Sequence, residues 1–276
     1  MASVPEPAPD PRLQGRTARY DRDEIVAQLE AFYRFLPHIP PSSIHCAPSG
    51  GWPSITAEAI GARGIHKTPE ALDLLRHLPY ISGDQPWIAP EAYPCDYRIL
   101  GERSTRDTPG WVHDVQQDAG NARLPDESPG GTEKWPAWVV QLTTGTDREG
   151  SCYMLDTTDG TVTEYCVVGY LYEPTYDGAD PRAWRDRMCG DKTFILADQI
   201  KAWRTEYREM RYVGVPDVGD GSGYPSLYFR SRDDGPGSYN WEETQELQSI
   251  YRRHGWPDEY DKEGCRKALK EWYLAQ

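Results

Sequence analysis

Long apolar runs are missing from this sequence. No stretch approaches the roughly 18 consecutive apolar residues that a membrane-spanning helix needs, and residues 1–15 contain no apolar segment of the kind found in secretory signals. These absences argue against a membrane protein and against a secreted one. We therefore expect an intracellular, cytoplasmic protein.

Clusters of cysteine and histidine are also missing. The six cysteines are widely spread, without a Cys-x-x-Cys motif, and the six histidines are scattered, without the helical spacing of a metal site. The pattern excludes a compact disulfide framework and predicts no metal site. Inside a cell we expect the thiols to be reduced.

Positive charge is scarce. The chain has 30 lysines and arginines against 44 aspartates and glutamates, a formal net charge of −14. Such a balance repels phosphate backbones and anionic membrane surfaces, and the sequence shows no local basic patch that would offset it. We expect neither nucleic acid nor membrane as a partner, which leaves a protein or a small molecule.

Recognisable catalytic motifs are absent as well. The sequence contains no Gly-x-Ser-x-Gly elbow, no P-loop and no dinucleotide-binding fingerprint. The glycine-rich run at residues 219–223 does not join a predicted strand to a helix, and it carries Asp220 where a phosphate would lie. We interpret it as a flexible turn and predict no cofactor.

Tyrosine and tryptophan are abundant. The chain has 18 Tyr and 10 Trp but 4 Phe. Tyr and Trp combine an apolar body with a polar tip, so they suit half-buried grooves and interfaces, although they also fill cores. Trp52 and Trp87 lie in proline-flanked loops, where they either line a groove or cover the edge of the core.

The strongest structural pattern is a hairpin within residues 137–170. Asp159 and Gly160 lie between two runs rich in Val, Thr and Tyr, which predicts two antiparallel strands joined by a two-residue loop. That loop pairs Asp156 with Thr163. It places one set of side chains on a common face: Met154, Asp156, Thr163 and Tyr165.

Asp156 interrupts this otherwise apolar face. A buried carboxylate needs hydrogen bonds or a cation, and Arg98 is one candidate. In an open cleft, Asp156 would instead serve as an acid, a base or a ligand contact. The same register puts Cys152 and Cys166 on opposite faces, so we expect no disulfide between them.

Helix signals flank this hairpin on both sides. Asp21 and Thr68 are predicted N-caps, and residues 198–210 carry apolar side chains at helical spacing. Asn240 and Asp261 are predicted to cap a C-terminal helical pair. Together these elements predict an α+β fold, with a mostly antiparallel sheet, helices packed on one face, and an extra C-terminal helical pair.

Composition divides the chain into three parts. Residues 1–19 are proline-rich and predict a flexible tail. Residues 20–215 form the predicted α+β core domain, with residues 101–134 as a polar surface excursion. Residues 216–276 are predicted to form a loop and the C-terminal helical pair, packed on the core.

Asp96, Tyr97 and Arg98 form the second polar candidate. We expect residues 96–100 to be extended, which puts Asp96 and Arg98 on one face and Tyr97 on the other. This pattern predicts either a polar site at the sheet margin or a salt-bridged strand end.

The segment that contains these residues resembles a known family. IAPEAYPCDYRIL, residues 88–100, is similar to the LP-x-DYR-x-L stretch of the SUKH superfamily, which includes the fungal Smi/Knr cell-wall regulators and many bacterial toxin-immunity proteins. Tyr93 stands where the family has Leu, and the family's stretch leads into a helix. Further segments match the family's order over residues 70–210, namely 138–142, 153–156, 159–162 and 192–203. The proline- and tryptophan-rich style also resembles uncharacterised filamentous-fungal proteins.

The resemblance implies an α+β sheet whose groove binds a partner protein, without catalysis or cofactor. Our first hypothesis is therefore a non-catalytic binding or regulatory module of SUKH-like fold. Its aromatic and acidic groove would be lined by Trp52, Trp87, Tyr97, Arg98 and Asp156.

The alternative is a cofactor-independent enzyme of specialised metabolism, such as a cyclase, isomerase or transferase. Asp96, Arg98, Asp156 and His66 would supply its acid–base and anion-holding groups. An enclosed aromatic pocket with Asp156 at its base would favour the enzyme. A closed core around Asp156 would remove its main support.

Overall fold

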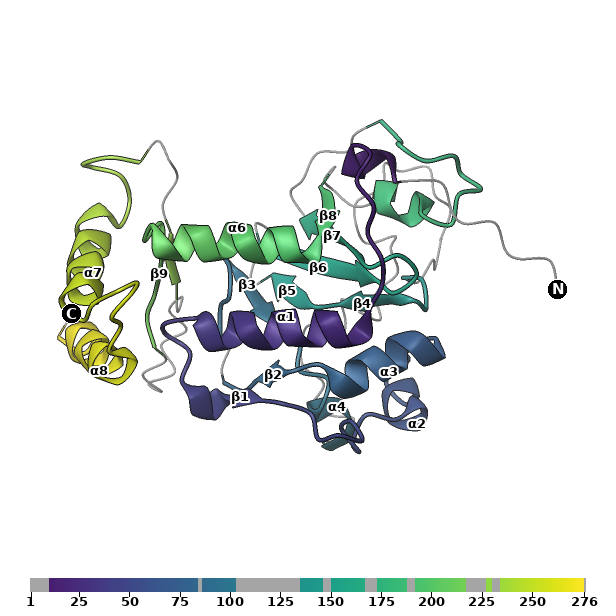
Figure 1. Ribbon diagram of the computed structural model, residues 1–276, viewed down its shortest axis with the longest axis horizontal. Coiled ribbons are helices and arrows are strands. Elements are labelled where there is room, and N and C mark those ends of the chain that lie inside the picture. The colour runs from purple at the N-terminus through teal and green to yellow at the C-terminus, as the bar shows by residue number, and fades with distance from the viewer. Residues whose placement is uncertain are drawn as a thin grey trace.

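The computed structural model describes most of the chain. The described residues are 10–83, 86–102, 135–145, 150–166, 173–187, 192–216, 227–229 and 234–275. Antiparallel sheets and helices make up an α+β fold, as predicted (Figure 1). Most of the predicted excursion at residues 101–134 lies outside the described residues. No helix of the described part of the chain is long and apolar enough to cross a membrane.

A four-stranded antiparallel sheet forms the centre of the molecule. Its strands, in spatial order, are β4 (Val139–Gln141), β6 (Ser151–Asp156), β7 (Thr161–Cys166) and β8 (Thr193–Ile195). Three short antiparallel pairs lie around it. They are β1 (Ile44–His45) with β2 (Tyr80–Ile81), β3 (Ala92–Pro94) with β5 (Thr143–Gly145), and β9 (Tyr212–Gly214) with β10 (Leu227–Phe229).

The predicted hairpin is β6 and β7, but its predicted register is wrong. Met154 pairs with Thr163 instead of Tyr165. Residues 157–160 form a longer turn than predicted, in which Gly160 N donates to Asp156 O at 2.8 Å. The shift is by two residues, and side chains alternate with period two, so the predicted faces are unchanged. Cys152 and Cys166 lie on opposite faces and are free thiols, as expected.

Three helices begin at the predicted N-caps. Asp21, Thr68 and Asp261 each accept a hydrogen bond from a backbone N–H three residues further on, which satisfies one of the free donors of a first helical turn. The helices are α1 (Arg22–Phe35), α3 (Pro69–His77) and α8 (Lys262–Tyr273).

The other predicted helices also form. They are α6 (Leu196–Arg208) and α7 (Trp241–Arg253). Asn240 is the N-cap of α7, as predicted, but it is left-handed, with φ of 56°, and its side chain makes no cap bond. Shorter helical elements are η1 (Pro11–Leu13), η2 (Pro41–Ser43), α2 (Ala57–Gly61), α4 (Ile99–Glu102) and η3 (Ala183–Arg187).

Helices α1 and α6 lie side by side over the central sheet (Figure 1). The rings of Phe32 and Trp203 stack with their centroids 5.3 Å apart, and Trp203 meets Tyr153 of β6 edge-on at 4.9 Å. These aromatic contacts join both helices to the sheet in one core.

The C-terminal helical pair adjoins the end of α1 and α6 (Figure 1). Trp256 packs on Phe35 with centroids 5.5 Å apart, and its Nε1 donates to Tyr207 O at 3.1 Å. Buried residues of α7 and α8 therefore belong to the same hydrophobic core as α1 and α6. The predicted division at residue 215 stays a prediction.

The extended conformation predicted for residues 96–100 is wrong. Asp96 Oδ1 accepts a hydrogen bond from Arg98 N at 3.1 Å, so the aspartate closes a turn on its own backbone. This turn leads directly into α4. Asp96 and Arg98 therefore belong to a turn before a helix and not to a strand.

Candidate functional site

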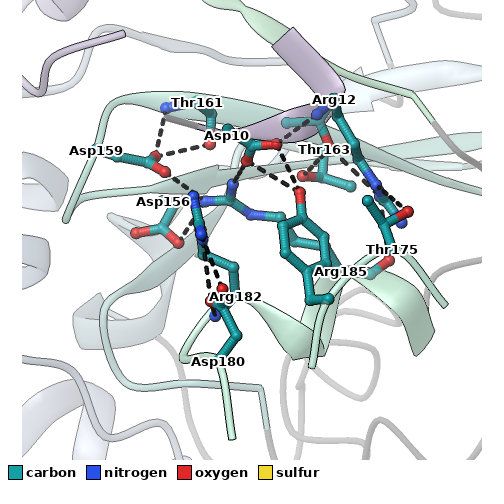
Figure 2. Close-up of polar contacts among 12 residues, drawn as sticks. Asp10, Arg12, Asp156, Asp159, Thr161, Thr163, Thr175, Asp180, Arg182 and Arg185 are labelled. Carbon is teal, nitrogen blue, oxygen red and sulfur yellow. Dashed lines mark hydrogen bonds and ion pairs between the residues drawn. The ribbon is translucent and has the colours of Figure 1, made fainter. Parts of the chain in front are cut away.

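A buried arginine forms the centre of a polar cluster with three carboxylates. The side chain of Arg185, from η3, is fully buried. Its Nη1 bonds the carboxylate of Asp10, while its Nη2 lies 2.8 Å from Oδ2 of both Asp156 and Asp159. Figure 2 shows this single guanidinium with the three carboxylates directed towards it.

In both Asp156 and Asp159, one carboxylate oxygen binds the local backbone and the other binds Arg185. Asp156 Oδ1 accepts from Thr158 N at 2.8 Å. Asp159 Oδ1 accepts from Thr161 N at 2.9 Å (Figure 2). The remaining oxygen of each faces the guanidinium. The two aspartates thus build the turn between β6 and β7 and bind Arg185 at the same time.

The carboxylate of Asp10 likewise binds both the local backbone and Arg185. It is the N-cap of η1, and its Oδ1 accepts from Arg12 N at 2.8 Å. The hydroxyl of Tyr176 donates to the same carboxylate, 2.8 Å from Oδ1 and 2.9 Å from Oδ2. The N-terminal segment is therefore held against residues 173–187 by a hydrogen-bonded, buried carboxylate.

Arg12 strengthens this attachment. Its Nη2 lies 2.7 Å from Asp186 Oδ1, and its guanidinium lies over the ring of Tyr176 at 5.1 Å. Asp186 also accepts from the backbone N–H groups of Thr175 and Tyr176, both at 2.9 Å. The flexible tail predicted for residues 1–19 is therefore wrong at residues 10–13, and residues 1–9 lie outside the described residues.

Burial and the charges within the cluster shift the pKa values of Asp156 and Arg185. Burial, and then the charge of Asp159, raise the pKa of Asp156 above its usual value, although Arg185 opposes the shift. Burial disfavours the charge on Arg185, but Asp159 and Asp156 outweigh it and raise the pKa of the guanidinium.

Asp156 cannot act on a substrate in this arrangement. It is 1% exposed, and both of its oxygens are occupied by Thr158 and Arg185. A general acid or base must come within hydrogen-bonding reach of the proton that it transfers. Asp156 is closed off from such contact and serves the fold.

Arg98 forms a second and smaller site. Its Nε and Nη2 make a two-pronged contact with Asp96, at 2.9 and 2.7 Å, and each of the two side chains is 14% exposed. The guanidinium lies over the rings of Trp52 and Tyr80, at 5.0 and 5.6 Å. Trp52 is half-buried and its Nε1 donates to Leu78 O at 2.9 Å.

The structure separates several residues that were predicted to share one groove. No hydrogen bond or ion pair of the described residues joins Asp156 to Arg98, so the predicted partnership of these two is wrong. Tyr97 is buried, with its hydroxyl donating to Gln141 O at 3.1 Å. Trp87 is half-buried, and its carbonyl accepts from His38 Nε2 at 2.9 Å.

His66 does not join either cluster. Its side chain is exposed, and no described hydrogen bond links it to Asp96, Arg98 or Asp156. Within the part of the chain that the structure describes, no group of three or more His, Cys, Asp or Glu side chains could hold a metal ion.

Sequence reasoning missed seven residues of these sites: Asp10, Arg12, Asp159, Tyr176, Arg185, Asp186 and Tyr80. One signal was available for Asp10, because an Asp before Pro11 has the same N-cap and N1 pattern as Thr68 before Pro69. No local pattern indicates that Arg185 reaches Asp156, which lies 29 residues away.

Comparisons of this chain with protein-family models, with curated proteins and with solved structures each find no match.

Proposed function

We propose that this chain is a non-catalytic, SUKH-like binding or regulatory module that binds a protein partner over Trp52 and the Asp96–Arg98 pair. The observation that carries the proposal is the fixed guanidinium of Arg98, held by Asp96 and covered by two aromatic rings. Trp, Tyr and Arg are the residues that most often dominate binding energy at protein interfaces. A side chain that is already immobile loses little entropy on binding.

The state of the carboxylates supports a non-catalytic role. Asp156 is buried against Arg185, and Asp96 gives both of its oxygens to Arg98. His66 lies apart from both. The groups on which an enzymatic mechanism would depend are thus occupied within the fold or separated from one another.

The order of elements supports the resemblance to the SUKH superfamily. In that family the DYR stretch leads into a helix, and here residues 96–98 form a turn that leads into α4. Strands β4 and β5 follow, then β6 ending at Asp156, the turn with Gly160, β7, η3, β8 with Phe194, and α6. The proposed binding surface includes fewer residues than the predicted groove, because the side chains of Tyr97 and Asp156 are buried.

Charge and thiol chemistry support an intracellular partner with a basic surface. The net charge of −14 attracts a positively charged protein and speeds its encounter, more strongly at low salt. Five cysteines of the described residues are free thiols, which fits a reducing compartment. A cytoplasmic location is part of the proposal.

The chain offers a matched control for testing the Arg98 site. Arg182 makes the same contact with Asp180, through Nε at 3.0 Å and Nη2 at 2.8 Å, and its guanidinium also lies over an aromatic ring, that of Tyr176. Arg98→Lys and Arg182→Lys each keep the charge and remove the planar fork, so they are comparable in their effect on the fold.

The test is capture from a native lysate with wild type and both variants, followed by measurement of Kd for the enriched protein. We expect wild type and Arg182→Lys to bind alike, and Arg98→Lys to bind at least about tenfold more weakly, since about 1.4 kcal/mol of contact is lost. Equal binding by both variants, or enrichment of no protein by the wild type, would overturn the proposal.

A further inference from the structure

Two arginines on α6 have no carboxylate partner among the residues that the structure describes. Arg204 and Arg208 lie one helical turn apart, with their guanidinium carbons 4.7 and 5.9 Å above the ring of Phe35 on α1. Neither forms an ion pair within the described part of the chain. Two positive charges therefore share one aromatic ring at the junction of α1 and α6.

This arrangement is unfavourable in the free protein. Like charges at positions i and i+4 of a helix repel each other. Arg204 is half-buried, and its Nε is a buried donor without a hydrogen bond. Burial and the charge of Arg208 together lower the pKa of Arg204. Folding alone does not explain why two uncompensated cations are placed here.

Three acidic residues on α1 and at the end of α6 are engaged with other arginines. Arg34, at the end of α1, lies 2.8 Å from Glu30, and Arg211 binds both Glu206 and Glu209. The C-terminal dipole of α6 favours a cation at its last residue, Arg208. That effect is confined to the last turn, so it does not account for Arg204, which lies a full turn earlier.

We propose that Arg204 and Arg208 bind a phosphate monoester, on a small molecule or on a phosphorylated side chain. Such a group carries a charge of about −1.5 to −2 near neutral pH, which matches two guanidinium groups, whereas a carboxylate matches one. The overall charge of −14 opposes a long polyanion but permits a single compact one. The site goes beyond the proposed function and does not depend on it.

Phe35 supplies the platform of this site. Its ring is half-buried against Trp256 and Tyr207, which fixes its position at the end of α1. The ring holds both guanidinium groups by cation–π contact and does not engage them in an ion pair. The exposed position of Arg208 gives an approach from solvent.

The first test is calorimetric titration of the full chain with inorganic phosphate, with sodium chloride adjusted to constant ionic strength. We expect saturable binding by wild type, and at least tenfold weaker binding by Arg204→Gln and by Arg208→Gln. Arg34→Gln is the control, since it removes a positive charge from the same end of α1 but one that Glu30 already neutralises. Tighter binding of N-acetyl-phosphoserine amide or of glycerol 3-phosphate than of inorganic phosphate supports the site and identifies the source of the monoester.

Urea unfolding without phosphate separates this site from a structural role. Arg204→Gln should unfold at equal or higher urea than wild type, because it removes the repulsion with Arg208 and a buried donor that has no hydrogen bond. Arg208→Gln removes the same repulsion but also a favourable contact with the helix dipole, so it should unfold at about the same urea concentration as wild type. The proposal is overturned if phosphate does not saturate the wild type, if Arg34→Gln weakens binding as much as Arg204→Gln, or if the variants lose stability together with binding.

Discussion

Arg185 and Arg204 are two buried or half-buried arginines with opposite surroundings. The Nε of each is a buried donor without a hydrogen bond. Three carboxylates nevertheless surround the guanidinium of Arg185, and none in the described part of the chain faces that of Arg204. Arg185 is fully buried, whereas Arg204 adjoins the exposed Arg208.

The different surroundings of the two guanidinium groups indicate different roles for Arg185 and Arg204. A buried ion requires counter-ions to offset the loss of its hydration, and Arg185 obtains three from two other segments of its own chain, the N-terminal segment and the hairpin turn. Its role is therefore structural: it joins the N-terminal segment, the hairpin turn and η3. A cation pair without counter-ions remains available to an outside anion.

The largest expected effect is that of Arg185→Met. This change leaves three carboxylates facing one another without their cation, so we expect a loss of about 3–5 kcal/mol in the free energy of unfolding. Urea denaturation at pH 7 measures it. The matched control is Arg16→Met, because Arg16 and Asp198 form an exposed pair, with side chains 58% and 44% accessible, and should lose less than about 1 kcal/mol. Similar losses for both variants would contradict the assigned role of Arg185.

His38 lies between the two extremes, since it is buried like Arg185 but lacks a carboxylate, like Arg204. Its Nδ1 has no hydrogen bond, its ring stacks on Tyr207 with centroids 5.9 Å apart, and Lys262 and Arg266 are the charged groups near it. Burial lowers the pKa of His38 from 6.5 to about 4. The folded protein therefore resists a proton that the unfolded chain accepts.

The sign of the pH effect follows from this shift. Between about pH 6.5 and pH 4 the unfolded state binds the proton and the folded state does not, so stability is full above pH 6.5 and falls as the pH is lowered. The full shift corresponds to about 3 kcal/mol. Urea midpoints measured from pH 7 to pH 4.5 should show the loss in wild type and in His66→Gln, and a flatter profile in His38→Gln. An unchanged profile in His38→Gln would show that other groups cause the dependence.

Tyr176→Phe tests the attachment of the N-terminal segment with a smaller effect. The buried hydroxyl donates to both oxygens of Asp10, and a hydrogen bond to a charged group contributes about 1.5–3 kcal/mol. Tyr207→Phe is the comparison, because its hydroxyl donates to the neutral carbonyl of Ile88 at 3.1 Å and should cost about 1 kcal/mol. A smaller loss for Tyr176→Phe than for Tyr207→Phe would argue against a stabilising role of the Tyr176–Asp10 contact.

The smallest expected effect is that of Arg204→Gln. Relief of the repulsion with Arg208 should raise the free energy of unfolding by a few tenths of a kcal/mol at low salt. Salt screens exposed charges, so the gain should shrink at high salt. Urea unfolding at both salt concentrations, with Arg34→Gln alongside, measures the difference. A clear loss of stability would place Arg204 with Arg185 among the structural arginines.

Local chemistry predicted much of the fold. The N-caps at Asp21, Thr68 and Asp261 were predictable because a cap and its first turn lie within four residues. The faces of the hairpin were predictable from period-two alternation, but its register was not. The side chains of Asp156 and Asp159 bond into the turn and lengthen it, which the Asp-Gly signal does not reveal.

The sites were less predictable than the fold. Asp156 was recognised as a carboxylate in need of a partner, but the partner came from η3, which the chain brings near only in three dimensions. The pairing of Asp96 with Arg98 was predictable, because the two residues are close in sequence. The contact of Tyr80 with Arg98 was not, because it depends on tertiary packing. The proline content led to the prediction of a flexible N-terminal tail, and the N-cap at Asp10 was therefore missed.

The most direct test of the contrast between Arg185 and Arg204 is one nuclear magnetic resonance titration. The Nε–Hε signals of both arginines are followed while inorganic phosphate replaces chloride at constant ionic strength. Both Nε groups are buried without a hydrogen bond, so neither signal starts from a bond that phosphate would have to replace. We predict that the Arg204 signal shifts saturably and that the Arg185 signal stays in place. Movement of both signals, or of neither, would contradict the division between a structural arginine and a ligand-binding one.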